Sequence, residues 1–217
     1  MTVGMRVLEE DAWTLAHPEG IWLEGRSRRS SELGWDSHNF LIMAIDDAGY
    51  VHLCGNMHVD PLIYFRTTRP LDVTSFERVD HMVGEQENRC TYPVFLQGPN
   101  NQLVFRYRDG QSGNVVDFHN VYDVFSRQWS RLLNVPLLDG LDRMNAYARM
   151  PERGPDGLWH MVWMWRDMPD CATNHNISYA RSEDFVHWTT GSGNALALPI
   201  TIKSGAEVDP VPPGGGL

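Results

Sequence analysis

Residues 40–54 read FLIMAIDDAGYVHLC: an apolar run, a polar turn ending in glycine, and a second apolar run. This pattern predicts a β-hairpin. The same arrangement returns at residues 92–107, YPVFLQGPNNQLVFRY, and at residues 154–163, GPDGLWHMVW. Aligning Gly49, Asn101 and Gly157 at the turns places the three units 52 and 56 residues apart. The chain therefore reads as copies of one β-rich unit.

Each unit continues in the same way after its hairpin. A further strand containing a tyrosine follows, at residues 63–67, 120–123 and 178–182, and then a bulky aromatic residue, Phe76, Trp129 or Trp188. Four short strands in about fifty residues are typical of a β-propeller blade. We therefore expect an all-β protein, with residues 1–217 in a single propeller domain and readable blades at about 38–90, 91–145 and 146–199. Residues 182–188 also resemble a degenerate Asp-box, the turn motif of sialidase-type propellers, without its usual glycine.

The length of the chain raises a question about closure. The 217 residues hold about four such blades, and propellers close with typically four to eight. The protein is then either a four-bladed ring or part of a longer propeller. We expect the second, because residues 208–217 offer no closing strand. An open propeller exposes unpaired strand edges, which predicts self-association.

Composition excludes several classes of protein. The net charge of −10 and a pI near 5.3 provide no basic footprint for nucleic acid. No apolar run approaches the 18 residues of a membrane span, and residues 1–14 lack the apolar core of a secretory signal. Three widely spaced cysteines are no disulfide framework and suggest buried free thiols.

The repeat register selects candidate functional residues. In successive units the strand before the turn opens with a His or Tyr, and a His or Arg follows seven to nine residues after the turn anchor: His38 and His58, Tyr92 and Arg108, Tyr147 and Arg166. Equivalent positions of successive blades surround one axis, so these side chains can converge at one end of a central channel. The plainer interpretation is that each merely caps a sheet edge.

Arg108 is central to this group. An arginine favours the phenolate of a neighbouring tyrosine, which lowers the pKa of that tyrosine, and it binds carboxylates with two hydrogen bonds. Arg106 has the same strand parity and is expected to serve the same face, whereas Tyr107 points the other way.

Seven short motifs support a resemblance to a known family: GWDSHN (34–39), GNMHVDPL (55–62), TYP (91–93), RYRDGQSGN (106–114), NAY (145–147), WRD (165–167) and NHN (174–176). From about Gly34 to Pro199 the chain resembles the BNR-repeat-containing proteins that include the propeller-fold ulvan lyases. The resemblance implies a seven-bladed propeller that cleaves uronic-acid-containing polysaccharide by β-elimination. It also implies an anionic polysaccharide as partner and a secreted or periplasmic location.

By motif, the residues that the resemblance assigns to the active site are His38, His58, Tyr92, Arg108 and Tyr147. Arg108, helped by His38 or Asn39, would neutralise the uronate carboxylate. Tyr92 would be the base and could return a proton to the leaving oxygen, with His58 as the second candidate for that role. Tyr147 would position the sugar.

Further residues are expected to bind substrate, and the chemistry itself requires no cofactor. The candidates for substrate binding are Trp35, Asn39, Arg106, Arg166 and Asn174.

The sequence also offers candidate ligands for a structural zinc site. Thiolate and imidazole suit Zn²⁺, and His160, Cys171 and His175 are the candidate ligands. The alternative is a buried histidine and an unrelated thiol.

Two other functions stay open. A sialidase-like glycoside hydrolase needs paired carboxylates, for which Asp36, Asp60 and Asp109 lie near the motifs. A non-catalytic propeller would need only aromatic stacking on sugars, by Trp35 or Trp165.

Overall fold

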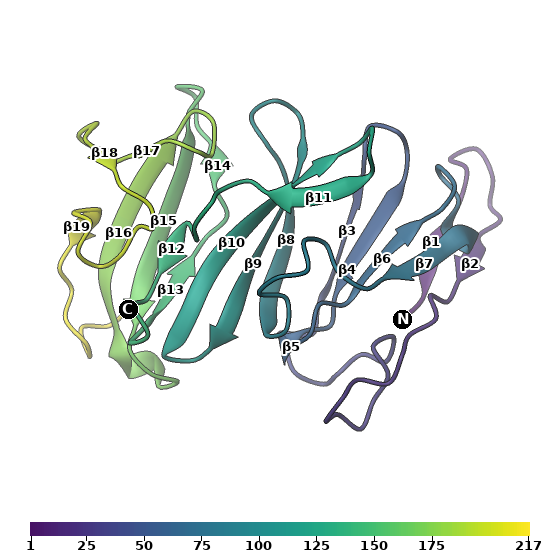
Figure 1. The fold of residues 1–217 in the computed structure, drawn as a ribbon, viewed down its shortest axis with the longest axis horizontal. Helices are drawn as coiled ribbons and strands as arrows, with labels where there is room; N and C mark the ends of the chain where they lie inside the picture. The colour runs from purple at the N-terminus through teal and green to yellow at the C-terminus, as the bar shows by residue number, and fades with distance from the viewer.

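The computed structural model describes all residues from Met1 to Leu217, and they form three successive antiparallel sheets with a small ribbon beside the first (Figure 1). The ribbon consists of β1 (Val3–Met5) and β2 (Thr14–Ala16). The first sheet contains β3 (Leu41–Ile45), β4 (Val51–Gly55), β6 (Tyr64–Thr67) and β7 (Phe76–Val79), hydrogen-bonded in that order.

The second and third sheets repeat this order and add short strands. The second contains β8 (Cys90–Gln97), β9 (Leu103–Gln111), β10 (Asn114–Asp123) and β11 (Gln128–Arg131), with β12 (Leu138–Asp139) on β10. The third contains β13 (Asn145–Ala148), β15 (Trp159–Arg166), β16 (Asn174–Ser182), β17 (Trp188–Thr189) and β18 (Ala195–Leu196), with β14 (Glu152–Arg153) on β15 and β19 (Glu207–Asp209) on β16. Residues 208–217 contribute only the end of β19, which pairs with β16 of the same sheet.

The protein is thus all-β, and its sheets are consecutive β-propeller blades, as the sequence predicts. They stand side by side in an arc, with the ribbon at one end and the third sheet at the other (Figure 1). The only helical segments are two three-residue 3-10 turns, η1 (Val73–Ser75) and η2 (Cys171–Thr173), so the fold has no membrane-spanning helix.

The three hairpin turns aligned in the sequence share one geometry. Gly49, Asn101 and Gly157 have left-handed backbones, with φ of 84°, 63° and 83°. Each donates its N–H to the carbonyl three residues earlier, at 2.9, 3.0 and 3.0 Å. Glycine and asparagine tolerate this conformation, so the turns are encoded locally.

Two apolar cores fill the spaces between neighbouring sheets. Phe65, Phe105, Tyr107 and Trp129 belong to the core between the first and second sheets, while Trp163, Trp165 and Trp188 fill the one between the second and third. Because side chains alternate along β9, Tyr107 faces the first core and the arginines on either side face the third sheet. The predicted parity of Arg106 and Arg108 is therefore confirmed. Trp165 is fully buried, so it is not available to stack on a sugar.

One further short strand crosses between sheets. β5 (His58–Asp60) follows β4 of the first sheet along the chain but pairs with β8 of the second, with His58 opposite Thr91 and Asp60 opposite Cys90. The sequence gives no sign of this crossing, because residues 55–62 read there as a polar loop. The crossing brings the middle of the first unit, between β4 and β6, against the beginning of the second.

Candidate active site

Six side chains from the three sheets form a continuous stack, here called the stacked row. Its members are, in order, His58, His38, Tyr92, Arg108, Tyr147 and Arg166. The sequence selected all six from the repeat register, and the structure brings all six together. None of the contacts that order the row could be read from spacing alone.

The first half of the row consists of three aromatic rings. The imidazoles of His38 and His58 lie parallel, with centroids 3.9 Å apart and an interplanar angle of 11°. The ring of Tyr92 follows His38 at 5.0 Å. His58 comes from β5, His38 from the loop before β3 and Tyr92 from β8, so the crossing strand is what assembles this half.

Strained backbone accompanies these residues. Tyr92 and Val59 both have left-handed backbones, with φ of 53° and 57°. For a β-branched residue such as Val59 this conformation is a genuine outlier. Strain of this kind persists only where surrounding contacts enforce it, and it gathers at functional sites. Here Val59 donates its N–H to the Thr91 hydroxyl at 2.9 Å, which holds the strained segment against β8.

The second half of the row alternates cations and phenol rings. The Arg108 guanidinium lies 4.7 Å from the ring centroid of Tyr92 and 4.5 Å from that of Tyr147. The Arg166 guanidinium also lies over Tyr147, 4.1 Å from its ring centroid, and donates to its hydroxyl at 3.1 Å. Asn174 holds Arg166 in place by accepting from its Nε at 2.6 Å. Asn174 therefore supports the row from behind.

Arg108 is buried without an anionic partner. Its Nε and Nη1 are inaccessible to solvent and make no hydrogen bond. Burial lowers the pKa of Arg108, although the guanidinium stays charged at any physiological pH. A buried, unpaired cation is costly, so the arrangement favours a site that receives an anion.

Arg106 has the opposite character, although it faces the same way. Its Nε donates to both oxygens of Asp117, at 3.0 and 2.9 Å, and its Nη2 donates to Oδ2 at 2.5 Å. Both residues are buried. The charge of Arg106 is therefore already neutralised, although its side chain lines the same pocket as Arg108, and its part in substrate binding stays a prediction. The neutralisation follows from the β9–β10 register, which the sequence does not show.

A pocket of about 460 Å³ opens beside the row. Its walls include Tyr92, Arg108 and Tyr147, with apolar surface from Phe40 and Ile42. The three row residues thus meet the same space as a cluster of apolar side chains. Such a mixture of apolar walls and a few convergent polar groups is typical of a small-ligand or substrate site.

The protonation of Tyr92 differs from the expectation. Burial raises the pKa of its phenol, and the nearby Arg108 lowers it by a smaller amount. The net shift is upward, so the prediction of a tyrosine with a lowered pKa is wrong in the free protein. Arg108 meets the face of the ring rather than the phenol oxygen, which explains the weak effect. At neutral pH Tyr92 is therefore a protonated phenol and a potential proton donor.

A carboxylate that the sequence did not place among the lyase residues joins the two histidines. Asp36 accepts hydrogen bonds from Nδ1 of His38 and from Nδ1 of His58, the second at 2.5 Å. Hydrogen bonds from the His38 backbone and from both imidazoles hold the pKa of Asp36 well below its usual range. The spacing D-x-H at residues 36–38 was the available signal, since an Asp two residues before a His can reach it.

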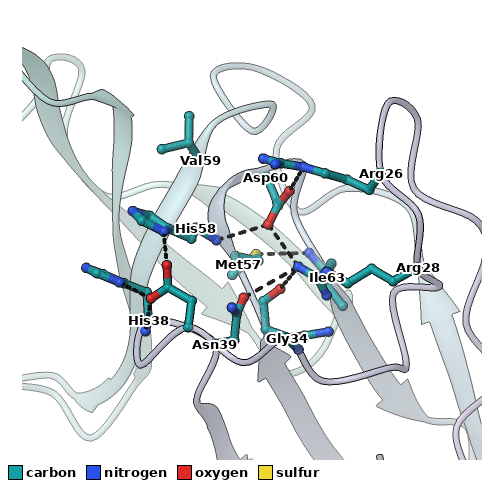
Figure 2. A network of polar contacts seen from close by, with 12 residues as sticks. Arg26, Arg28, Gly34, His38, Asn39, Met57, His58, Val59, Asp60 and Ile63 are labelled. Atoms are coloured by element: carbon teal, nitrogen blue, oxygen red, sulfur yellow. Dashed lines mark hydrogen bonds and ion pairs between the residues drawn. The ribbon is translucent and has the colours of Figure 1, made fainter.

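A second carboxylate fixes the strand that carries His58 (Figure 2). Asp60 is buried and pairs with Arg26 at 2.8 Å and Arg28 at 3.1 Å. The same carboxylate accepts from the backbone N–H of His58 at 3.1 Å. Arg28 also donates to Asn39 at 3.4 Å, which ties the loop before β3 to this cluster. Asn39 thus lies in the supporting network and does not line the pocket.

The remaining substrate candidate is Trp35. Its side chain is fully exposed on the loop next to Asp36. An exposed indole beside the site is free to stack on a sugar ring.

The predicted zinc ligands do not lie together. His160 is opposite Arg181 near one end of the β15–β16 pair, and His175 is opposite Trp165 near the other, about 16 Å away at the rise of a strand. His160 bonds Tyr179 at 2.6 Å and Asp156 at 2.9 Å, and Cys171 is exposed. The triad is therefore not assembled. The three-residue group whose ligand atoms do converge is Asp36, His38 and His58.

The carboxylates considered for hydrolysis are already engaged. Asp36 holds two histidines, Asp60 pairs with two arginines, and Asp109 pairs with Arg89 at 3.2 Å. Paired catalytic carboxylates need one free base and one free acid across a sugar. These three offer no such pair.

Comparison with known proteins yields a family and two similar folds. The sequence profile of BNR repeat-containing family members matches residues 1–217. The structure of the polysaccharide lyase Uly1 superimposes with a TM-score of 0.65 at 19% identity, covering 79% of this chain and 46% of that one. A PL25 ulvan lyase bound to -[GlcA(1-4)Rha3S]- superimposes with a TM-score of 0.63 at 17% identity, covering 78% and 44%.

These likenesses concern the fold, and the chain spans less than half the length of both solved structures. A comparison with curated protein sequences gave no match.

Proposed function

Because the chain belongs to the BNR repeat-containing family, we propose that it is a polysaccharide lyase, which cleaves a uronic-acid-containing polymer by β-elimination. The solved proteins that share its fold include ulvan lyases, and the stacked row offers the groups that such a reaction needs. The -[GlcA(1-4)Rha3S]- repeat bound to one of those lyases is the substrate we propose for this chain. A polymer of this kind would be met outside the cytoplasm.

One observation carries the proposal: Arg108 is a buried cation with two unpartnered nitrogens beside an open pocket. A uronate carboxylate in that pocket would supply the missing negative charge. The whole protein carries a net charge of −10, so the attraction for an anionic polymer has to be local. A hydrolase acting on neutral sugars would have no use for such a cation.

The proposed β-elimination breaks two bonds of the uronate and forms one double bond. A base removes the proton on C5 of the uronate, and that C–H electron pair becomes the C4=C5 double bond. The C4–O bond breaks, and the leaving oxygen takes a proton from an acid. Charge builds on the carboxylate as the C5 proton leaves, and Arg108 stabilises it.

The acid and the base follow from protonation. Tyr92, whose raised pKa keeps it protonated, is the proton donor to the leaving oxygen. The base is a neutral imidazole, and His38 is the stronger candidate because its ring lies next to Tyr92. His58 stands behind it. Tyr147 and Arg166 extend the row along the sugar chain.

The test is a product assay on ulvan and on other uronate polymers. Elimination leaves a C4=C5 double bond, which absorbs in the ultraviolet, and hydrolysis does not. We expect the ultraviolet absorbance to rise with the native protein. With Arg108→Met we expect the rate of this rise to be about 10²–10³-fold lower. Arg69→Met is the matched control, because Arg69 forms an exposed ion pair with Asp72 far from the row.

Two results would contradict the proposal. New reducing ends without a double bond would make the protein a hydrolase. Binding of the polymer without any cleavage would make it a carbohydrate-binding propeller, with Trp35 as the first residue to test.

A further inference from the structure

The two histidines of the stacked row share one carboxylate. Asp36 accepts Nδ1 of His38 on Oδ1 and Nδ1 of His58 on Oδ2. The carboxylate is itself fixed, because its Oδ1 also accepts the backbone N–H of His38 at 2.8 Å. One side chain therefore determines how two imidazoles are oriented.

The hydrogen bonds define the tautomer of each ring. The pKa of Asp36 lies well below its usual range, so the carboxylate is ionised and can only accept. Each Nδ1 must then carry a hydrogen. Neither Nε2 makes a hydrogen bond, so in a neutral ring Nε2 keeps its lone pair free.

We propose that Asp36 is a positioning residue that locks both His38 and His58 in the Nδ1–H tautomer, with each Nε2 available to a ligand. The role in turnover rests on the proposed lyase function, but the tautomer does not. An imidazole held in this way is a ready base, because no rotation or tautomer exchange precedes proton removal. Asp36 acts through the histidines and need not touch substrate.

Asp36, His38 and His58 could instead bind a cation, but the geometry of the two rings disfavours a cation site. A metal bound to an imidazole nitrogen lies close to the plane of that ring. The two rings are parallel and 3.9 Å apart, so a single ion cannot lie in both planes. Two separate carboxylate oxygens, one for each ring, match the stacked arrangement better.

The first experiment reads the tautomers directly and needs no substrate. In the ¹⁵N-labelled protein, long-range ¹H–¹⁵N correlation spectra distinguish a protonated imidazole nitrogen from an unprotonated one. We expect His38 and His58 to show Nδ1–H and a bare Nε2, with His38→Gln and His58→Gln supplying the assignments. In Asp36→Asn we expect both rings to become mixtures of the two tautomers.

Asp156→Asn is the matched control. It removes the carboxylate from another Asp–His pair, Asp156 with His160, and is expected to leave His38 and His58 unchanged. Nε2–H signals in the native protein, or signals that Asp36→Asn does not alter, would overturn the proposal. So would loss of the Nδ1–H signals on adding Zn²⁺ with recovery on chelation, because that would make the group a cation site.

The second experiment separates positioning from folding. We expect Asp36→Asn to lower kcat by about 10–100-fold with little change in KM, as is found when the partner of a functional histidine is removed. Asp36→Glu should recover part of the loss, since it restores a carboxylate. A fall in kcat together with a rise in KM and a loss of thermal stability would indicate a merely structural residue.

If the native protein shows no lyase activity while the tautomer spectra come out as expected, the proposed function fails and the positioning role stands.

Discussion

Two clusters in this molecule are built from the same residue types, and they do different things. In the core, His52 bonds the Tyr64 hydroxyl at 2.7 Å and Asp46 at 3.3 Å, and the Trp129 indole donates to the same hydroxyl at 3.2 Å. In the second cluster, Asp36 bonds the two histidines of the stacked row, and the ring of His38 adjoins Tyr92, which lines an open pocket. Both clusters contain Asp, His and Tyr.

The two clusters differ in how many of their side-chain polar atoms lack a hydrogen-bond partner. Both ring nitrogens of His52 have partners and the residue is fully buried, so the core cluster has no free group. In the row, each histidine keeps one nitrogen free, and the Tyr92 hydroxyl has no hydrogen-bond partner. Residue type alone does not separate a structural cluster from a chemical one, whereas unsatisfied groups that face a pocket do.

The sharpest way to test this contrast is to remove one hydroxyl from each cluster. We expect Tyr92→Phe to lower the lyase rate by about 10²–10⁴-fold, because it removes the proton donor. Its melting temperature should hold, since the hydroxyl bonds nothing. We expect Tyr64→Phe to keep its activity per folded molecule and to lose about 1–3 kcal/mol of stability, because His52 and Trp129 lose a buried partner. The measurements are the lyase rate and the thermal unfolding of both variants. Full activity in Tyr92→Phe would contradict the contrast.

Neighbouring arginines extend the same comparison. Arg106→Met leaves the Asp117 carboxylate buried and unpaired, and should cost about 3–5 kcal/mol of stability. Arg108→Met removes a buried cation that has no anionic partner and loses only its two cation–π contacts, so its loss of stability should be much smaller than that of Arg106→Met. Denaturant unfolding of the two variants measures the difference. Equal destabilisation would mean that Arg108 is a structural residue like Arg106.

Acid should lower the stability of the fold through its buried histidines before most carboxylates become protonated. Burial lowers the pKa of His52 and of His119 from 6.5 to about 4. As the pH falls through 6.5 the unfolded chain takes up these protons and the folded chain does not, so stability declines until about pH 4. The loss is at most about 3 kcal/mol for each histidine.

The measurement is the free energy of unfolding across this pH range, with His52→Gln as the comparison. That variant should show a shallower decline. An unchanged slope would show that the protonation of His52 does not contribute.

The smallest effect is expected at an exposed Asp–His pair. Asp156→Asn breaks the contact with His160, which lies at the surface of the third sheet. Exposed pairs contribute little, because solvent screens them. We expect no measurable change in melting temperature or in lyase rate. A clear loss of activity would place functional chemistry outside the stacked row.

The sequence predicts what is encoded locally. Glycine or asparagine at each turn and apolar runs on either side identify the hairpins, and their regular spacing identifies the blades. The six row residues emerge because a repeat fixes equivalent positions. The resemblance adds the chemistry, and none of these steps requires knowledge of long-range contacts.

The rest depends on register and crossing. Asp117 neutralises Arg106 only because β9 and β10 pair with a particular alignment. Asp36 meets His58 only because β5 leaves its own sheet, and His160 and His175 fall at opposite ends of one strand pair, where no metal could join them. Charge balance of this kind is decided in three dimensions, and spacing in the chain does not reveal it.

The crossing of β5 has one more consequence. Blades of a propeller usually touch through side chains, which can slide over one another, but here a strand of one blade is woven into the ladder of the next. Such a seam resists shear between the two sheets. The separation between the backbones of His58 and Tyr92 is therefore set by this ladder, because His58 pairs with Thr91, the residue before Tyr92. It also means that the first blade cannot be replaced independently of the second. Replacing it would remove His58, and with it β5, the strand at the edge of the second sheet.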